Sequence, residues 1–196
     1  MNHGLHATLL ALCMVGVRTT PCLGQNPAIE QTEAESRLYV RSVARVFGTA
    51  PAEADLLAGW LSHPSELPVL LHLAARAGVS PDIVGSLRRS GASWQRLASK
   101  FGLSSAVFYV EVGETQVGGV LARPLRQFRD RPPARWHAIA LTDMEIVALV
   151  NVRVLAEAAS TSPSEVAVAL DSPAPDFVAA YVGLLRSRAG AGPVEG

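Results

Sequence analysis

The sequence predicts a mainly α-helical domain of stacked short helical hairpins around one central apolar helix. Three observations support this prediction. Apolar residues recur at helical spacing from Gln31 onward, whereas the strict alternation of a half-buried strand is scarce. Several segments begin with helix-start patterns, and three helix ends share one short sequence. The 196 residues suffice for one domain, expected over residues 30–188 and followed by a flexible tail at 189–196.

The first expected element is a signal peptide at residues 1–24. Residues 5–17 form an apolar run that is shorter than the roughly 20 residues needed to span a bilayer. Both cysteines, Cys13 and Cys22, lie in this segment, so cleavage after Gly24 would leave a chain without thiols. We therefore expect an exported protein, periplasmic or extracellular, with no transmembrane segment after cleavage. An uncleaved anchor and a start codon placed too early are the alternatives.

Four patterns mark helix starts. Thr32–Glu35, Thr142–Glu145 and Ser162–Glu165 each resemble a capping box, in which a hydroxyl accepts from a first-turn amide and a carboxylate reaches back. The run Ser80-Pro81-Asp82 is a variant, in which serine caps, proline takes the first helical position and aspartate complements the helix dipole. The first of these helices is expected to end near Phe47.

The shared sequence at three helix ends suggests a repeated hairpin. The shared sequence starts with an alanine near the helix end, continues with a small residue and a β-branched residue, and finishes with Ala-Pro or Ser-Pro. Its three copies are at residues 44–51, 74–81 and 156–163. The second and third copies break again at Ser90-Gly91 and Ser172-Pro173. One such hairpin cannot bury its apolar face alone, so we expect the copies to stack on one another.

The helix expected over residues 143–158 is apolar on almost every face between Met144 and Ala156. This pattern is typical of a helix in the middle of a bundle. Within it, Asn151 is expected to have a buried hydrogen-bond partner, with a role in ligand binding as the alternative. Arg153 is expected to extend toward solvent.

Residues 113–141 interrupt the helical pattern with glycines, prolines and arginines, and we predict an elaborated basic loop there. The preceding residues 107–112, VFYVEV, mix β-branched and aromatic residues. They could form a strand that pairs with residues 136–141, giving one small β-hairpin that flanks the 113–135 loop. A helical conformation of 104–111 is the alternative, and the sequence leaves both open.

The same loop contains the candidate binding site. Residues 113–141 contain five arginines and only two acidic residues, Glu114 and Asp130, which gives a local charge of about +3. Guanidinium groups beside aromatic rings suit carboxylate, phosphate or glycan contacts, so an envelope protein or an acidic or glycan ligand is the expected partner. A solvated or internally paired loop is the alternative. The predicted binding residues are Arg123, Arg126, Arg129, Arg131, Arg135 and Trp136.

No catalytic motif is present. The sequence has no HExxH or HxH spacing and no GxSxG, Walker A or GxGxxG pattern, so we predict neither a metal nor a cofactor. The balance of 17 basic and 17 acidic residues gives no reason to expect nucleic acid. The predicted function is a non-catalytic interaction or structural module of the cell envelope or exterior. The alternative is an envelope hydrolase that uses groups assembled by folding, for which the candidates are Glu66, Glu111, Glu145, His72 and His137.

Residues 94–111 suggest a third possibility, because Ala98 and Gly102, four residues apart, resemble the turn of a helix-turn-helix, and Leu97, Leu103 and Phe108 are apolar as its packing requires. The second helix of a DNA-binding motif would have polar and basic side chains, and the run SSAVFYVEV in its place, residues 104–112, has no basic residue. The chain could therefore be a DNA-binding protein only if its second helix lacked the usual basic side chains and if the start codon were placed too early, so that no signal peptide existed.

The run GVSPDIVGSLRRSGASWQRLASKFGLSSAVFYV, followed after the basic loop by RWHAIALTDMEIVALVNVRVLAE, resembles a family of small secreted bacterial proteins of unknown function. The resemblance covers roughly residues 65–160, and SPDxVxxLRRxGxSWxxLAxxxGL is its most specific part. It implies a mostly helical exported protein and offers no catalytic residues to transfer. The third hairpin departs from this string, with Ser172–Pro175 in place of an Arg/Gly turn.

Overall fold

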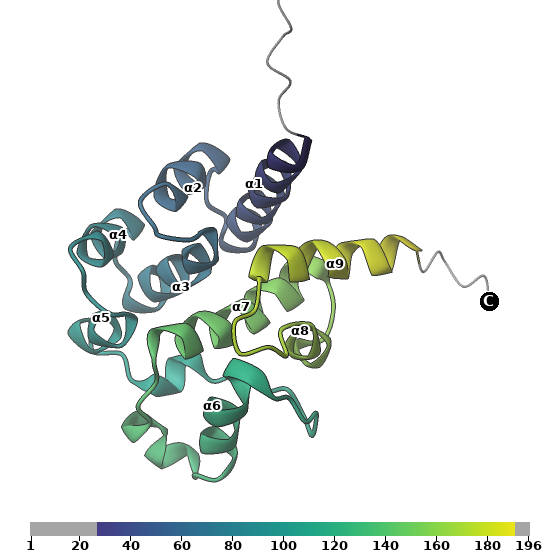
Figure 1. Cartoon of the computed structure of the whole chain (residues 1–196). Coiled ribbons are helices and arrows are strands. Elements are labelled where there is room, and N and C mark those ends of the chain that lie inside the picture. The colour runs from purple at the N-terminus through teal and green to yellow at the C-terminus, as the bar shows by residue number, and fades with distance from the viewer. Residues whose placement is uncertain (1–26, 191–196) are drawn as a thin grey trace, which may run out of the picture.

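The computed structural model describes residues 27–190, which fold into helices packed around one central buried helix (Figure 1). This confirms the prediction of a mainly α-helical protein, and the described residues contain no β-strand. The expected signal peptide at residues 1–24 and the end of the expected tail, residues 191–196, lie outside the described residues. In chain order the helices are α1 (Pro27–Phe47), α2 (Pro51–Ala58), η1 (Pro64–Glu66), α3 (Leu67–Ala77), α4 (Pro81–Arg89), α5 (Trp94–Lys100), η2 (Ser105–Phe108), α6 (Gly119–Arg129), η3 (Pro133–Ala138), α7 (Asp143–Ala159), α8 (Pro163–Ala169) and α9 (Phe177–Gly190), where η denotes a 3-10 helix.

Helix α7 is the centre of the fold. It packs against α1, α3, α5, α6, α8 and α9, and almost every side chain between Glu145 and Ala156 is buried (Figure 1). Its start is the predicted capping box, since the Thr142 hydroxyl accepts from the Glu145 N–H at 3.3 Å and the Glu145 carboxylate accepts from the Thr142 N–H at 2.8 Å. The prediction of a central apolar helix is therefore confirmed.

The one amide side chain inside this helix has its hydrogen bonds satisfied by the core. Asn151 is fully buried, its Oδ1 accepts from the Tyr39 hydroxyl, and its Nδ2 donates to the carbonyls of Ser65 at 2.9 Å and Val147 at 2.8 Å. These bonds connect α7 with α1 and η1. Asn151 is thus a satisfied core amide, as expected, because an unpaired amide at this depth would be strongly destabilising.

The helices are joined by one recurring corner. A residue with positive φ follows the helix, the next N–H donates to the carbonyl five residues back, and a new helix starts after one further residue. The three predicted copies have this geometry at Gly48, Gly78 and Ser160, with φ of 64°, 65° and 52°. Two further corners at Gly91 and Gly102 share it. The helices before and after the three predicted corners also pack against each other, α1 with α2, α3 with α4 and α7 with α8.

Two expectations about local structure are wrong. Helix α1 begins before Thr32, whose hydroxyl donates to the Ala28 carbonyl at 2.9 Å inside the helix, so Thr32–Glu35 is not a capping box. Arg153 does not extend toward solvent, because its guanidinium donates to the backbone carbonyls of Val107 and Tyr109. Burial and the nearby Arg76 lower the pKa of Arg153.

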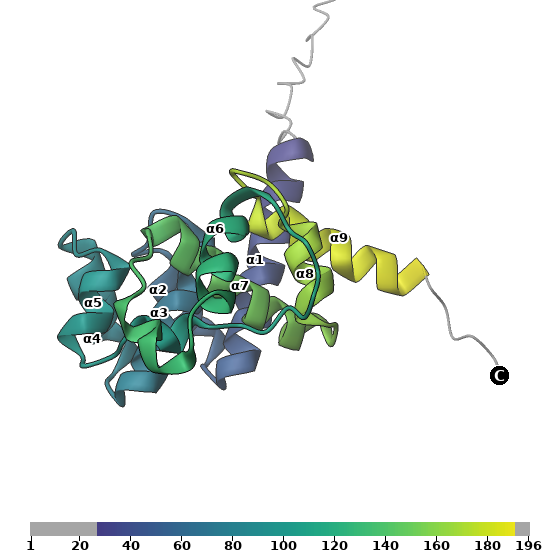
Figure 2. The same cartoon turned by 90° about the horizontal axis from the view of Figure 1, so that it is seen from below.

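The predicted loop at 113–141 is not a loop throughout. It contains helix α6 and the 3-10 helix η3, and the β-hairpin that was expected to flank it does not form within residues 27–190. Residues 105–108 instead form η2, and residues 109–112 have no regular structure. Figure 2 shows the long connection between η2 and α6 passing α8 before it returns to the start of α6.

Helix α6 is held in place at its first residue. Gly119 has a φ of 52°, and a Cβ atom there would lie 2.3 Å from the Ser172 carbonyl oxygen, so no other residue fits. The next residue, Val120, donates its N–H to the same carbonyl at 3.0 Å. Leu121, Leu125 and Phe128 then point into the core. The start of the candidate site is therefore fixed against the α8–α9 connection.

Within residues 27–190, no helix has the length and apolar character that a membrane crossing would need.

Candidate binding surface around helix α6

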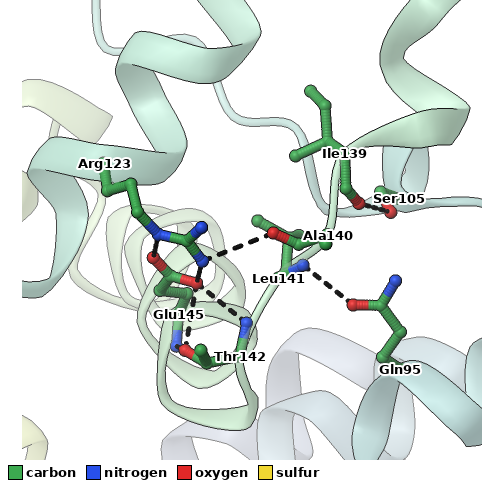
Figure 3. A network of polar contacts seen from close by, with 8 residues as sticks. All are labelled: Gln95, Ser105, Arg123, Ile139, Ala140, Leu141, Thr142 and Glu145. Carbon is green, nitrogen blue, oxygen red and sulfur yellow. Dashed lines mark hydrogen bonds and ion pairs between the residues drawn. The ribbon is translucent and has the colours of Figure 1, made fainter.

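Arg123, the first predicted binding residue, belongs to the scaffold. Its Nε donates to Glu145 Oε1 at 2.6 Å, its second nitrogen pairs with Oε2, and it also donates to the Ala140 carbonyl at 3.3 Å (Figure 3). The Glu145 side chain is only 7% exposed. Arg123 is thus already neutralised by a partner within the chain, and the alternative of an internally paired arginine applies to it.

The Glu145 carboxylate is held in its charged form. Burial by itself would raise its pKa, but the hydrogen bonds from Arg123 and Thr142 outweigh burial and leave the pKa below its ordinary value. The same bond to Glu145 raises the pKa of Arg123. Around this pair, Leu141 donates to the Gln95 side chain at 2.8 Å and Ser105 donates to Ile139 at 2.5 Å (Figure 3). The network fastens the segment before α7 to α5, α6 and η2.

The four other predicted arginines are exposed. Within residues 27–190 their guanidinium groups have no hydrogen bond and no ion pair. They lie within ten residues at the end of α6 and in the following segment, with the exposed Asp130 among them. We call this set the basic surface; it consists of Arg126, Arg129, Arg131 and Arg135.

Trp136 keeps this segment folded back on α6. It is half-buried, and its Nε1 donates to the carbonyls of Phe128 at 3.0 Å and Arg131 at 2.9 Å. Its ring lies 4.2 Å from that of Tyr109 and meets Phe128 edge-on at 5.4 Å, measured between centroids. Trp136 therefore acts on the site by positioning the chain between α6 and η3, rather than as an exposed aromatic contact.

A pocket of about 280 Å³ lies beside the basic surface. One wall is the segment from Tyr109 to Glu114, and the other is formed by Leu125, Phe128 and Arg129 of α6. Glu111 and Glu114 are exposed carboxylates on the first wall, opposite Arg129. The pocket thus offers charges of both signs beside the aromatic rings of Tyr109 and Phe128.

A second arginine network was missed by the sequence analysis. Arg88 binds Glu66 through Nη2 at 2.6 Å and Asp143 through Nη1 at 2.6 Å, and it lies over the Trp94 ring at 4.5 Å. Burial opposes its charge, but the bonds to the two carboxylates outweigh burial and raise its pKa. These contacts join η1, α4, α5 and α7. Partners 22 and 55 residues away cannot be identified from one sequence.

The groups proposed for a hydrolase are dispersed. Glu66 and Glu145 are each paired with an arginine, and His72 lies in the core, where its Nε2 donates to the Val107 carbonyl at 3.0 Å. Burial lowers the pKa of His72 to about 4, so this histidine is neutral at pH 7. Glu111 and His137 line different pockets. No pocket that we describe combines two of these five groups.

Within residues 27–190, no three His, Cys, Asp or Glu side chains gather closely enough to hold a metal ion.

The helix-turn-helix resemblance ends at the turn. Helix α5 is followed by Gly102, with φ of 72°, and then by a single 3-10 helix, η2, in which Ser105 and Phe108 are buried. Residues 94–111 therefore lack the second α-helix that would enter a DNA groove.

No family model matches this chain, and comparisons with curated proteins and with solved structures find no match either. The resemblance of residues 65–160 to small secreted bacterial proteins therefore stays a prediction, and the candidate function depends on the geometry of this chain alone.

Proposed function

We propose that this protein is a non-catalytic binding module that contacts an acidic partner, an envelope protein or an anionic glycan, through its basic surface. The observation that carries the proposal is the exposure of Arg126, Arg129, Arg131 and Arg135 without partners among the described residues. Arg88 and Arg123, by contrast, each bind carboxylates within the chain. Exposed guanidinium groups on a segment held by Trp136 can each donate two hydrogen bonds to a carboxylate or sulfate.

The proposal places this module outside the cytoplasm, on a scaffold of repeated helical hairpins. The apolar run at residues 5–17 supports export, and the recurring corners support a repeated hairpin. Fractionating the host cells and sequencing the mature N-terminus tests export. A mature protein that begins near residue 25 in the periplasm or medium is expected, and a cytoplasmic protein that retains Met1 would contradict it.

Binding to two defined polyanions tests the basic surface. We expect the full chain to bind heparin and poly-glutamate at low salt, because exposed charge pairs weaken with ionic strength. The variant Arg126→Ala/Arg131→Ala/Arg135→Ala should bind roughly tenfold more weakly, since it loses three charge-assisted contacts.

The matched control is Arg41→Ala/Arg45→Ala/Arg96→Ala, which removes the same charge from exposed arginines of α1 and α5. It should bind nearly as well as the wild type. If both variants lost binding equally, net charge rather than the basic surface would govern the contact, and the proposal would be wrong.

A further inference from the structure

The outward side of helices α1 and α9 forms an apolar groove of about 480 Å³. Each helix contributes four residues at positions i, i+3, i+4 and i+7, starting at Gln31 in α1 and at Val182 in α9. This spacing places the four side chains of each helix on one face over two helical turns. We call these eight residues the α1–α9 face. One of its large apolar side chains, Leu38, is 44% exposed, so the groove is open to solvent.

The free ends of the two helices extend beyond the body of the molecule (Figures 1 and 2). Residues 28–34 of α1 and 186–190 of α9 are exposed throughout, and no other element among residues 27–190 lines the groove. One or two helical turns are only marginally stable in water by themselves, so contacts with a partner would stabilise both ends. Any cover of this face comes from outside the described part of the chain.

The two sides of the groove carry opposite charges at the same level. Arg186 donates to Glu35 at 2.7 Å, and the Arg186 side chain is still 66% exposed. One turn further, Tyr39 of α1 meets Tyr181 of α9 edge-on, with 6.0 Å between the ring centroids. These two contacts show that the helices run antiparallel along the groove. The α1–α9 face as a whole has no net charge.

A face of this kind is complementary to itself. A two-fold axis along the groove exchanges the acidic and basic sides, so that α1 of one copy meets α9 of the other and Glu35 lies opposite the partner's Arg186. The apolar residues of the two copies then cover each other. A strongly acidic or basic partner would gain little from a face without net charge. Charge and symmetry therefore favour a second copy of this chain as the occupant.

We propose that this protein forms a symmetric dimer in which two α1–α9 faces pack against each other. Two turns on each of two helices are a small contact compared with the roughly 800 Å² per partner of a standard interface, so we expect a dissociation constant of about 10–100 µM. Helix α6 lies away from this face, at the bottom of Figure 1. The dimer therefore leaves both basic surfaces open, and it does not depend on the proposed function.

Sedimentation equilibrium of the full chain tests the dimer. Between about 1 µM and about 300 µM, the average mass should rise from that of one chain toward that of two. Leu38→Glu places a charge inside the contact in both copies and should weaken dimerisation roughly tenfold or more. The matched control Ile29→Glu adds the same charge to an exposed residue of α1 outside the face, and it should dimerise like the wild type. Circular dichroism establishes that both variants are folded.

Mixing two charge variants separates the contact between copies from the ion pair within one chain. The face carries two positive charges in Glu35→Arg and two negative charges in Arg186→Glu. Each variant alone should dimerise roughly tenfold more weakly than the wild type, because like charges meet across the contact, whereas an equimolar mixture should form heterodimers. An ion pair that acts only within one chain would be lost in both variants, and mixing them would restore nothing.

The pair of Glu33 and Arg37 supplies the matched control, since it is an exposed ion pair of α1 outside the face. Glu33→Arg and Arg37→Glu should dimerise like the wild type, both alone and mixed. The proposal is overturned by a chain that stays monomeric at about 300 µM, by association that Leu38→Glu leaves unchanged, or by a mixture that forms no heterodimer. Binding of laurate in the groove of a monomeric chain would also overturn it, and would show that the face holds an acyl chain.

Discussion

Arg88 and Arg126 place the same functional group in opposite surroundings. Arg88 is bound between Glu66 and Asp143 and lies over Trp94, with a side chain only 19% exposed. Arg126 projects from α6 without any partner among the described residues. The Arg88 network joins four elements of the fold, whereas the basic surface joins none. The contacts of Arg88 are thus accounted for by stability, whereas the unpaired arginines are the ones to which we assign the proposed binding role.

Loss of the Arg88 side chain should have the greatest effect on stability. Arg88→Ala leaves two carboxylates without their counter-ion, and we expect it to lower the free energy of unfolding by about 3–5 kcal/mol. The matched change Arg126→Ala should alter it by no more than about 0.5 kcal/mol. Urea unfolding monitored by circular dichroism measures both. Similar losses in the two variants would show that Arg88 is no more structural than a surface arginine.

The second prediction concerns the pH dependence of stability and compares the buried His72 with the exposed His137. The folded state holds the pKa of His72 near 4, whereas an unfolded histidine titrates near 6.5. As pH falls below about 6.5, the unfolded chain therefore binds a proton that the folded chain excludes, and stability decreases. We expect a loss of about 2–3 kcal/mol between pH 7.5 and 4.5.

The measurement is urea unfolding at a series of pH values in this range. The variant His72→Gln should lose this part of the pH dependence, and the variant of the exposed residue, His137→Gln, should retain the wild-type profile. The range stops at pH 4.5 because Glu145, whose pKa is lowered, adds stability that is lost only as pH falls through its folded pKa. An unchanged slope in His72→Gln would place the titrating group elsewhere.

Replacement of Trp136, which is half-buried and holds the basic surface against α6, should have the smallest effect on stability. Trp136→Phe removes the Nε1 donor to the Phe128 and Arg131 carbonyls but keeps an aromatic ring beside Tyr109. We expect a loss of about 1 kcal/mol in the free energy of unfolding, together with weaker heparin binding as the basic segment loosens. Trp60→Phe, at a half-buried tryptophan of another region, serves as the control and should leave heparin binding unchanged. A stability loss without any change in heparin binding would remove Trp136 from the site.

The sequence was informative where local chemistry decides the structure. The Thr142–Glu145 capping box and the end of α1 at Phe47 depend on neighbouring residues, and both predictions are confirmed. Helices α4 and α8 begin at the expected prolines, but their predicted caps are incomplete. The Ser80 hydroxyl donates to the Asp82 carboxylate and caps no first-turn amide, and the Glu165 carboxylate accepts from the Thr161 hydroxyl and not from the Ser162 N–H. The burial of Asn151 also followed from the apolar residues around it. Its partners Tyr39 and Ser65 did not, because they come from distant parts of the chain.

Helix α6 was missed although a signal was present. Leu121, Leu125 and Phe128 have the spacing of a buried helical face, but the glycines and Pro124 around them favoured a loop. The five predicted arginines could not be sorted from sequence either. Only the fold brings Glu145 to Arg123 and leaves the other four unpaired, since that partner lies 22 residues further along the chain.

The recurring corner has a consequence for the order of folding. Each corner is closed by a hydrogen bond between residues five apart, as between Thr49 and Ala44 or Thr161 and Ala156, so it can form before distant segments meet. Chains dominated by such local contacts generally fold fast. The contacts between α1 and α9, including the ion pair of Arg186 with Glu35, close the longest loop in the described chain. We therefore expect helical corners to form first and the docking of the two terminal helices to complete the native state.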